Sequence, residues 1–302
     1  MIHNDKIEKK TISLVLGSGG ARGYAHIGAI EELQKQGYEI GSISGSSMGA
    51  LVGALYACGK LEQFKKWVLT LDMFDVVKLV DFSLTSKGII RGDKLFDIIN
   101  DTIGKTKIED LPISYTAVAT DIIKQKEIWL QKGLLLDAVR ASVAIPSILT
   151  PKEIAGRYLI DGGVLNPLPV APTISDSTDL TIAVSLNGKN RKKYNIDTKQ
   201  KVKKQQTNMK KIFFEITQKA EQLMTKDKKT SFDDIGMFDV MGKTIDIMQN
   251  SILESKMAGY KPDILIDIPN DACGFYEFNK AYDMIELGRI ITKEKIKEIK
   301  DV

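Results

Sequence analysis

Residues 40–59 read IGSISGSSMGALVGALYACG and carry no charged side chain. An uncharged run of this length, about 20 residues, is long enough to cross a bilayer as a helix. Nine of its positions are glycine or serine, however, and residues of these types favour turns over a continuous membrane helix. The run therefore predicts a buried strand over 40–44, a tight turn over 45–49 and a helix over 50–59.

A similar unit stands upstream of this run. Residues 11–16 form a short apolar stretch, followed by GSGGARG over 17–23 and by helical spacing of apolar residues over 24–36. Strand-like runs recur downstream, at 114–120, 127–130, 158–160, 180–185 and 264–268. Helical patterns lie between them, at 61–71, 92–103 and 135–142. Strands that alternate with helices predict an α/β fold with a largely parallel central sheet flanked by helices.

The composition fits a globular protein of the reducing cytoplasm. The chain has 302 residues, 43% apolar and 27% charged, which is enough to bury a sizeable core. Its two cysteines, Cys58 and Cys273, are far apart in sequence and build neither a disulfide framework nor a zinc site. The first ten residues precede too short an apolar run for an export signal. We expect a cytoplasmic location and leave open a peripheral contact with the inner membrane face.

Positive charge is concentrated in residues 189–211, the basic segment, which holds ten lysines and arginines against one acid within a chain of net charge +4. Two interpretations stay open, a solvated loop and a surface that attracts the phosphates of an anionic membrane. Nucleic acid is not an expected partner, because Tyr194 is the one aromatic residue in the segment and no recognition motif accompanies it.

Two amphipathic helices are expected after the basic segment. Their apolar stripes consist of Ile212, Ile216, Ala220 and Leu223, and of Met241, Ile245, Met248 and Ile252. Such stripes usually pack on the protein's own core, although a methionine-rich face also suits contact with lipid. Residues 76–91 are the stretch in which a lid would fall.

The turn over 45–49 matches the Gly-x-Ser-x-Gly pattern of a nucleophile elbow. The glycines on either side allow a strained turn that holds the hydroxyl of Ser47 at a helix N-terminus. An ordinary turn in a packed α/β unit is the alternative. Both histidines, His3 and His26, precede Ser47, whereas an α/β-hydrolase places its acid and then its histidine after the serine. A hydrolase built on Ser47 must therefore use another base.

Asp161 is the best candidate for that base. It lies in LIDGG, residues 159–163, where a carboxylate at the end of a strand is followed by Gly162 and Gly163. The usual pKa of aspartate, about 3.9, makes it a weak base, so burial would have to raise its pKa. Asp-Gly-Gly by itself is also typical of an ordinary turn. His26 is the rival base.

The glycine cluster at 17–23 can supply backbone N–H groups to an oxyanion at the positive end of a helix. The predicted donors are Gly19, Gly20, Ala21 and Met48. A dinucleotide or phosphate cradle is the competing interpretation. It is disfavoured because Arg22 stands where a glycine is needed, and because Gly104-Lys105-Thr106 and Gly242-Lys243-Thr244 lack the upstream glycine of a P-loop.

Together, the motifs at 19–23, 45–49 and 161–163, in this order, resemble those of the patatin-like phospholipase family. The resemblance is to its stand-alone bacterial members, which are related to the catalytic domain of neuropathy target esterase. Two further blocks agree with it, ASVAIP at 141–146 and NPLPV at 166–170. The motifs span residues 14–172, and the C-terminal third is similar in a looser way.

The resemblance implies a patatin-like three-layer fold and a Ser-Asp dyad that hydrolyses acyl esters of lipids without a metal or cofactor. It assigns Ser47 as nucleophile, Asp161 as base and residues 19–23 as the oxyanion loop, and a dyad explains the missing late histidine. Ser18 and Ser46 depart mildly from the family pattern, in which glycine and threonine are frequent. The resemblance also marks residues that support the motifs, namely Gly17, Arg22, Gly23, Gly45, Gly49, Gly162 and Gly163.

We therefore expect one domain, with a catalytic region at 11–185 and, at 186–302, the basic segment and a C-terminal helical accessory region packed on it. The predicted function is a serine acyl hydrolase that cleaves fatty-acyl esters of lipids or phospholipids through an acyl-enzyme. The alternative is a non-catalytic regulatory or adaptor protein that uses the same fold as a binding module. The lipid class, the acyl position and the oligomeric state stay open.

Overall fold

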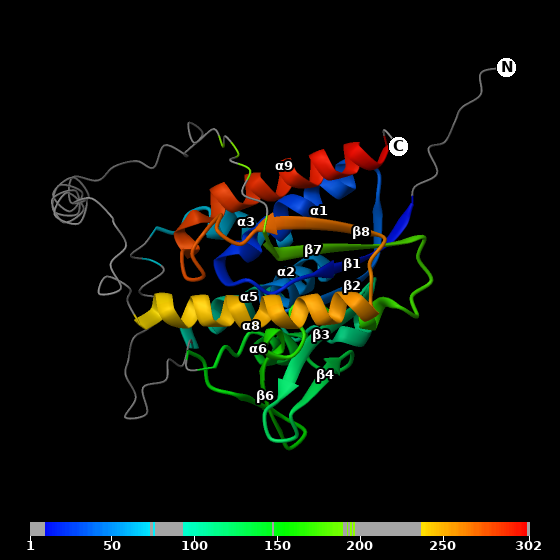
Figure 1. The fold of residues 1–302 in the computed structure, drawn as a ribbon. Coiled ribbons are helices and arrows are strands. Elements are labelled where there is room, and N and C mark those ends of the chain that lie inside the picture. Colours follow the sequence, from blue (N-terminus) through cyan, green and yellow to red (C-terminus); the bar gives the residue numbers. More distant parts are fainter. Residues whose placement is uncertain are drawn as a thin grey trace, which may run out of the picture.

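The structure, a computed structural model, describes residues 10–72, 93–146, 148–189 and 237–300, with the single positions 75, 192, 194 and 196 (Figure 1). Most of the basic segment lies outside this part of the chain. So do the helix expected over 212–223 and the stretch 76–91 in which a lid would fall.

Within the described residues, one eight-stranded sheet runs in the order β5-β6-β3-β2-β1-β7-β8, with β4 paired to β3. Five strands are parallel: β1 (Thr11–Leu16), β2 (Glu39–Ser46), β3 (Ser114–Asp121), β7 (Leu180–Gly188) and β8 (Ile264–Pro269). Three short strands are antiparallel to their neighbours: β4 (Lys126–Leu130), β5 (Lys152–Ile154) and β6 (Arg157–Asp161). The predicted largely parallel sheet is confirmed, and β5 is a strand that the sequence did not predict.

Helices cover both faces of this sheet. The α-helices are α1 (Ala25–Lys35), α2 (Met48–Ala57), α3 (Leu61–Val68), α5 (Asp93–Ile103), α6 (Leu135–Ser142), α8 (Met237–Gly259) and α9 (Ala281–Lys300). Short 3-10 helices are η1 (Gly20–Tyr24), η2 (Ile108–Asp110), η3 (Gly162–Val164), η4 (Ala171–Thr173) and η7 (Phe278–Lys280). The uncharged run 40–59 becomes β2 and α2, as predicted, and most of it is buried.

The core has two parts because successive side chains of a strand point to opposite faces of the sheet. Leu14 and Leu16 of β1 join the larger cluster, which includes residues of α1, α2 and α9. Val15 joins a smaller cluster on the other face, against which Leu253 and Met257 of α8 pack. In Figure 1, α8 accordingly crosses one face of the sheet while α1 and α9 lie together on the other side. The arrangement is the three-layer α/β fold expected from the sequence.

Two expectations from composition can be compared with the described residues. Cys58 and Cys273 are both free thiols. In this part of the chain, no helix combines the length and the apolar character needed to span a membrane.

Candidate active site

Ser47 lies at the junction of β2 and α2, where the chain turns sharply. Its backbone has φ 56° and ψ −125°, a region that residues with a side chain rarely enter. Glycines make the turn sterically possible. A Cβ at Gly49 would lie 2.1 Å from the carbonyl oxygen of Leu16, and one at Gly45 would lie 2.6 Å from the backbone of the first turn of α2. The predicted elbow is therefore formed around Ser47.

Pairing with β3 brings Asp161 to this elbow. β2 runs parallel to β3 and its last residue, Ser46, pairs with Val118. β6 runs antiparallel to β3 and its last residue, Asp161, pairs with Ala119. Because β4 pairs with the same residues of β3 from the opposite edge, β2 and β6 share one edge of β3 and meet at their C-terminal ends. Ser47 and Asp161, 114 positions apart in sequence, thus become neighbours.

The two side chains are in direct contact. The hydroxyl of Ser47 donates a hydrogen bond of 2.6 Å to Oδ2 of Asp161. The other carboxylate oxygen, Oδ1, accepts a 2.7 Å hydrogen bond from the N–H of Gly163. Both side chains are buried. The carboxylate is therefore fixed in orientation, with one oxygen held by the backbone and the other facing the serine.

The pKa of Asp161 is raised to about 7, chiefly because burial disfavours the charged carboxylate, and the hydrogen bonds from Ser47 and Gly163 only partly offset this effect. A carboxylate whose pKa lies near neutrality accepts a proton far more readily than an ordinary aspartate does. The condition set by the sequence, that burial must strengthen this base, is met by its surroundings.

Ser142, at the end of α6, supports the elbow from behind. Its hydroxyl accepts a 3.0 Å hydrogen bond from the backbone N–H of Ser47 and donates a 2.6 Å hydrogen bond to the carbonyl of Val118. It thereby connects the nucleophile turn to β3. Ser142 belongs to the ASVAIP block, so its place in a motif was visible in the sequence, whereas its contact with Ser47 was not.

Residues 17–23, which we call the glycine loop, lie against the start of α2. The approach is so close that a Cβ at Gly23 would lie 2.4 Å from the Cβ of Met48. Gly20 and Met48 are the first residues of η1 and α2, so their N–H groups have no acceptor within their own helices. The amide of Gly19 has no acceptor anywhere in the described part of the chain. Among the described residues none of these three amides has a recorded acceptor outside its own helix, so all three stay candidate donors.

The predicted donor Ala21 differs from these three. Its N–H donates a 2.9 Å hydrogen bond to the carbonyl of Phe275, in the loop after β8. An amide that is used in this way cannot also bind a substrate oxygen. The contact removes Ala21 from the set of candidate donors and gives it a structural role, holding the glycine loop against the C-terminal part of the chain.

The remaining glycines of the motifs lie next to these groups. Gly17 follows β1 and its N–H donates to the carbonyl of Val184 at 3.0 Å. Gly162 begins η3 directly after Asp161. A side chain at Gly163 would collide with Ser18 and Gln249. Each glycine motif predicted from the sequence is thus packed within this one site.

His26, the rival base, has a different partner. Its ring N–H at Nε2 donates a 2.8 Å hydrogen bond to the carbonyl of Gly17. Burial lowers the pKa of the imidazole to about 4, so the ring is neutral at physiological pH. The hydroxyl of Ser47 is directed to Asp161 and not to this ring. His26 therefore stabilises the start of the glycine loop.

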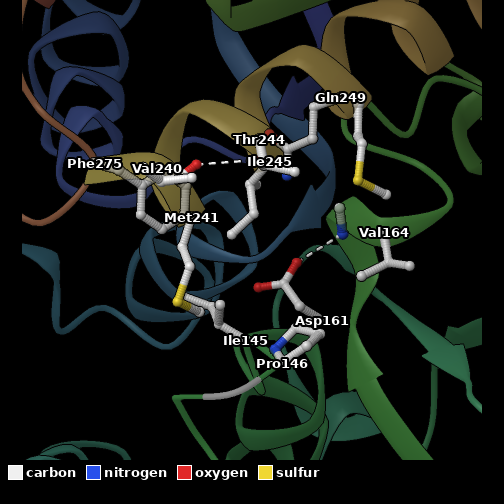
Figure 2. A pocket seen from close by; sticks show the side chains of 12 residues that line it. Ile145, Pro146, Asp161, Val164, Val240, Met241, Thr244, Ile245, Gln249 and Phe275 are labelled. Atoms are coloured by element: carbon white, nitrogen blue, oxygen red, sulfur yellow. Dashed lines mark hydrogen bonds between the residues drawn. The ribbon is translucent and has the colours of Figure 1, made fainter. Parts of the chain in front are cut away.

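A cavity of about 310 Å³ opens beside the Asp161 carboxylate. Figure 2 shows the carboxylate between Ile145 and Pro146 on one side and the side chains of α8 on the other. The lining is predominantly apolar: Ile145, Pro146, Asp161, Gly163, Val164, Val240, Met241, Thr244, Ile245, Met248, Gln249 and Phe275. An apolar cavity next to a serine and a base suits the acyl chain of an ester.

This cavity bears on the apolar stripe of α8. The sequence left open whether Met241, Ile245 and Met248 pack on the protein's core or contact lipid, and these three side chains line the cavity. The core contact of α8 is made further along the helix, by Leu253 and Met257. The helical period in the sequence identified the apolar face of α8 correctly, but it could not show that part of this face lines a cavity.

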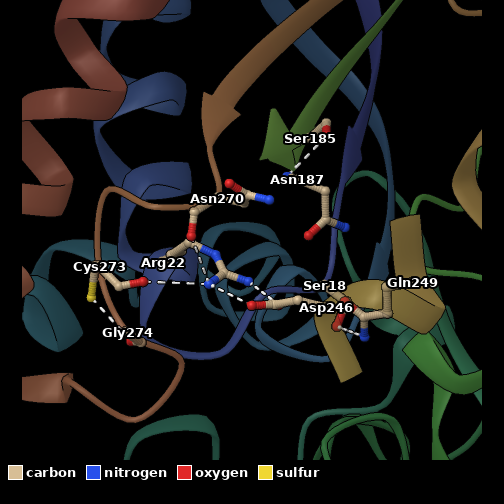
Figure 3. A network of polar contacts seen from close by, with 9 residues as sticks. All are labelled: Ser18, Arg22, Ser185, Asn187, Asp246, Gln249, Asn270, Cys273 and Gly274. Carbon is tan, nitrogen blue, oxygen red and sulfur yellow. Dashed lines mark hydrogen bonds and ion pairs between the residues drawn. The ribbon is translucent and has the colours of Figure 1, made fainter. Parts of the chain in front are cut away.

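Arg22 joins the glycine loop to α8 and to the loop after β8 (Figure 3). Its guanidinium is 1% exposed. Nη2 lies 2.5 Å from a carboxylate oxygen of Asp246, and Nη1 donates to the carbonyls of Asn270 and Cys273 at 3.1 and 3.3 Å. A buried cation needs such partners. Arg22, predicted only as a motif residue, thus anchors the cavity-lining helix.

Gln249 of α8 is a site residue that the sequence did not identify. Its side-chain amide donates a 2.9 Å hydrogen bond to the hydroxyl of Ser18, and both groups are buried. Gln249 also lines the cavity together with Asp161. Its position in the chain is far from every motif, so no local signal pointed to it.

Within the described residues, no three histidine, cysteine, aspartate or glutamate side chains gather closely enough to hold an ion.

Comparison with known proteins agrees with this geometry. The model of the patatin-like phospholipase family matches residues 14–174. The chain belongs to the patatin-like phospholipase family, and membership indicates a hydrolase that acts on lipid esters.

Among its relatives is an uncharacterized NTE family protein of Mycobacterium tuberculosis, with 38% identity over 94% of this chain and 91% of that protein. The neuropathy target esterase sws of Drosophila sechellia is 34% identical over 53% of this chain and 11% of its own length. The crystal structure of VipD from Legionella pneumophila aligns with a TM-score of 0.44 and 16% identity, over 95% of this chain and 67% of that one.

Proposed function

We propose that this protein is a serine acyl hydrolase that cleaves fatty-acyl esters of lipids with the dyad Ser47–Asp161. The observation that carries the proposal is the 2.6 Å hydrogen bond from the Ser47 hydroxyl to a buried carboxylate whose pKa is raised to about 7. This pairing places a nucleophile and a base of suitable strength in contact.

The proposed reaction begins when Asp161 accepts the proton of the Ser47 hydroxyl as Oγ attacks the ester carbonyl. The N–H groups of Gly19, Gly20 and Met48 stabilise the oxyanion of the tetrahedral intermediate. When the intermediate collapses, the ester C–O bond breaks and protonated Asp161 returns the proton to the departing alcohol. Water then attacks the acyl-enzyme with Asp161 again as base, which releases the fatty acid and restores Ser47.

Lipid is the proposed substrate because the cavity beside the dyad is apolar. An acyl chain that enters it meets Met241, Ile245 and Met248 instead of water. We place this reaction on phospholipids or lysophospholipids, with the protein in the cytoplasm and in peripheral contact with anionic membrane surfaces. We further propose that residues 11–185 carry the dyad and that residues 186–302 complete the acyl cavity through α8.

The test is covalent labelling of the purified full-length chain with a fluorophosphonate, read by intact mass. Wild type is expected to gain one adduct, and Ser47→Ala none, because the reagent reports an activated serine. Asp161→Asn should label far more slowly. Hydrolysis of a soluble short-chain ester is measured alongside. Labelling of Ser47→Ala, or full esterase activity in Asp161→Asn, would refute the dyad. A folded wild-type protein that neither labels nor hydrolyses the ester would favour a non-catalytic binding module.

A further inference from the structure

The end of the sheet formed by β3, β4 and β6 exposes apolar side chains. Ile122 and Ile123, in the turn between β3 and β4, are 46% and 73% exposed, and Tyr158 of β6 is 49% exposed. The N–H of Ile122 donates a 3.0 Å hydrogen bond to the carbonyl of Tyr158, so the three residues are adjacent. Turns normally carry glycine, asparagine, aspartate or serine. Two isoleucines in this place are unfavourable in water unless something covers them.

The turn holds these isoleucines in a fixed position. Asp121, at the end of β3, is buried, and its Oδ1 accepts hydrogen bonds from the N–H groups of Ile123 and Lys124 at 3.1 and 2.9 Å. An aspartate that bonds to the backbone two and three residues ahead stabilises a tight turn. The turn cannot easily fold back to bury its apolar side chains, because these bonds set its conformation.

Positive charge surrounds the exposed apolar group. Lys124, Lys126 and Arg157 are exposed, and within the described part of the chain none of them forms an ion pair. Glu153 is the one exposed acid in residues 122–126 and 153–158. We call residues 122–126 with 157 and 158 the β3–β4 tip. Its apolar centre and basic margin are complementary to a surface with an apolar interior and anionic headgroups.

The tip lies close to the dyad. β6 begins with Arg157 at the tip and ends with Asp161, and at about 3.3 Å per residue this separation is about 13 Å. Figure 1 shows this end of β3, β4 and β6 projecting from the body of the protein, on the side opposite α9. A surface that contacts the tip is therefore also near Asp161 and Ser47.

We propose that the β3–β4 tip docks this protein on an anionic lipid surface, with Ile122, Ile123 and Tyr158 inserted among the acyl chains and the three cations bound to lipid phosphates. The inference rests on the proposed function, since it says where a lipid hydrolase meets its substrate. A protein partner is less suited to the tip, because a stable protein interface buries about 800 Å² on each side and three side chains offer far less.

The experiment measures cosedimentation of the full-length chain with vesicles of phosphatidylcholine, with and without phosphatidylglycerol. Ile122→Ser combined with Ile123→Ser is expected to weaken binding to the anionic vesicles at least about tenfold, because each isoleucine loses its transfer into lipid. The matched control is Ile174→Ser. Ile174 is 64% exposed and precedes β7, so it lies at the other end of the sheet, and its substitution should leave binding unchanged.

A second pair of variants tests the charges. Lys124→Glu with Lys126→Glu should abolish the preference for anionic vesicles, as should added salt. The control, Lys293→Glu with Lys297→Glu, places the same charge change on exposed positions of α9 and should keep that preference. None of these variants alters the dyad, so hydrolysis of a soluble short-chain ester should equal that of wild type in all of them.

The proposal would be overturned if the isoleucine variant bound vesicles as well as wild type does, or if wild type did not bind them. It would also be overturned if each control variant lost as much binding as its matched tip variant. Failure of the proposed function would look different. A wild-type protein that hydrolyses no ester but binds vesicles through the tip would refute the hydrolase and leave the docking surface intact.

Discussion

The guanidinium of Arg22 and the carboxylate of Asp246 form an ion pair with an N–O distance of 2.5 Å, in which the arginine is almost wholly buried. The pair joins the glycine loop, which supplies the candidate oxyanion donors, to the helix that lines the acyl cavity. Two halves of the site that are far apart in the sequence are thus joined by this ion pair, together with the hydrogen bond from Gln249 to Ser18.

Removal of Asp246 should therefore destabilise the fold strongly. Asp246→Ala leaves Arg22 buried without its counter-charge, and we expect the free energy of unfolding to fall by about 3 kcal/mol. Urea denaturation measures this change. The matched control is Glu254→Ala, which removes the partner of Lys189 from an exposed pair on the same helix and should have no measurable effect. Equal effects of the two substitutions would contradict the structural role of Arg22.

The pKa of Asp161 predicts the pH profile. Because the base must be ionised, kcat/KM for a soluble ester should rise with pH and level off above about pH 7. A profile that is flat between pH 5 and pH 8 would contradict the assignment of Asp161 as the base.

The same pKa predicts an effect of opposite sign on stability. The folded state keeps a proton on Asp161 up to about pH 7, whereas the unfolded chain releases it at about pH 3.9. Stability should therefore decrease as pH rises between these values. Asp161→Asn removes this cost. The stability of the variant minus that of wild type should therefore be larger at pH 8 than at pH 5. Thermal unfolding at both pH values tests this, and a pH-independent difference would contradict it.

The apolar cavity predicts a dependence on acyl-chain length. Ile245→Trp fills part of the cavity beside Asp161 and should reduce kcat/KM for long-chain esters at least about tenfold, while acetate esters are hydrolysed as before. Ile247→Trp is the control, because Ile247 lies on the same helix but does not line this cavity. An equal loss for short and long esters would point to a distorted dyad instead.

Gln249 should act as a positioning residue through Ser18. Gln249→Ala removes the hydrogen bond to Ser18 in the glycine loop and should lower kcat by about tenfold, which corresponds to the usual free energy of one such bond. Ser18→Ala should lower kcat to a similar degree, and the double variant should be no worse than either. Asn250→Ala, at the next position of α8, serves as control. Additive losses in the double variant would show that the two residues act separately.

The nucleophile elbow predicts a position that tolerates no side chain. Gly49→Ala would place a Cβ 2.1 Å from the carbonyl oxygen of Leu16 and should destabilise the protein by about 3 kcal/mol. Gly41→Ala is the control, since its nearest neighbour would lie at an ordinary contact distance of 3.5 Å. Chemical denaturation distinguishes them. Similar stabilities of the two variants would contradict the packing of α2 on β1.

The sequence predicted those parts of the fold and candidate site whose signals are local. Strand and helix periods located β1, β2 and α2, and the motif around Ser47 indicated the elbow because its glycines and serine are neighbours in the chain. The pairing with Asp161 was implied by the family resemblance that the three motifs carry, and the structure brings these two residues together.

Contacts between distant segments could not be predicted in the same way. The hydrogen bonds of Gln249 to Ser18 and of Ser142 to Ser47 depend on how α8 and α6 pack. The sequence of a helix does not indicate which distant segment it will contact. The use of the Ala21 amide by Phe275 is of the same kind. The apolar period of α8 gave the face of the helix, but a period does not distinguish a core from a cavity.

The end-to-end placement of β2 and β6 along β3 also has a consequence for the newly made chain. The dyad exists only in one register, because a slip of one residue in β6 would move Asp161 by about 3.3 Å and turn its side chain to the other face of the sheet. On the proposed mechanism, a chain that leaves the ribosome therefore carries a serine without its base until residue 161 has joined β3. On the same mechanism, ester hydrolysis begins only after the sheet is complete around β3.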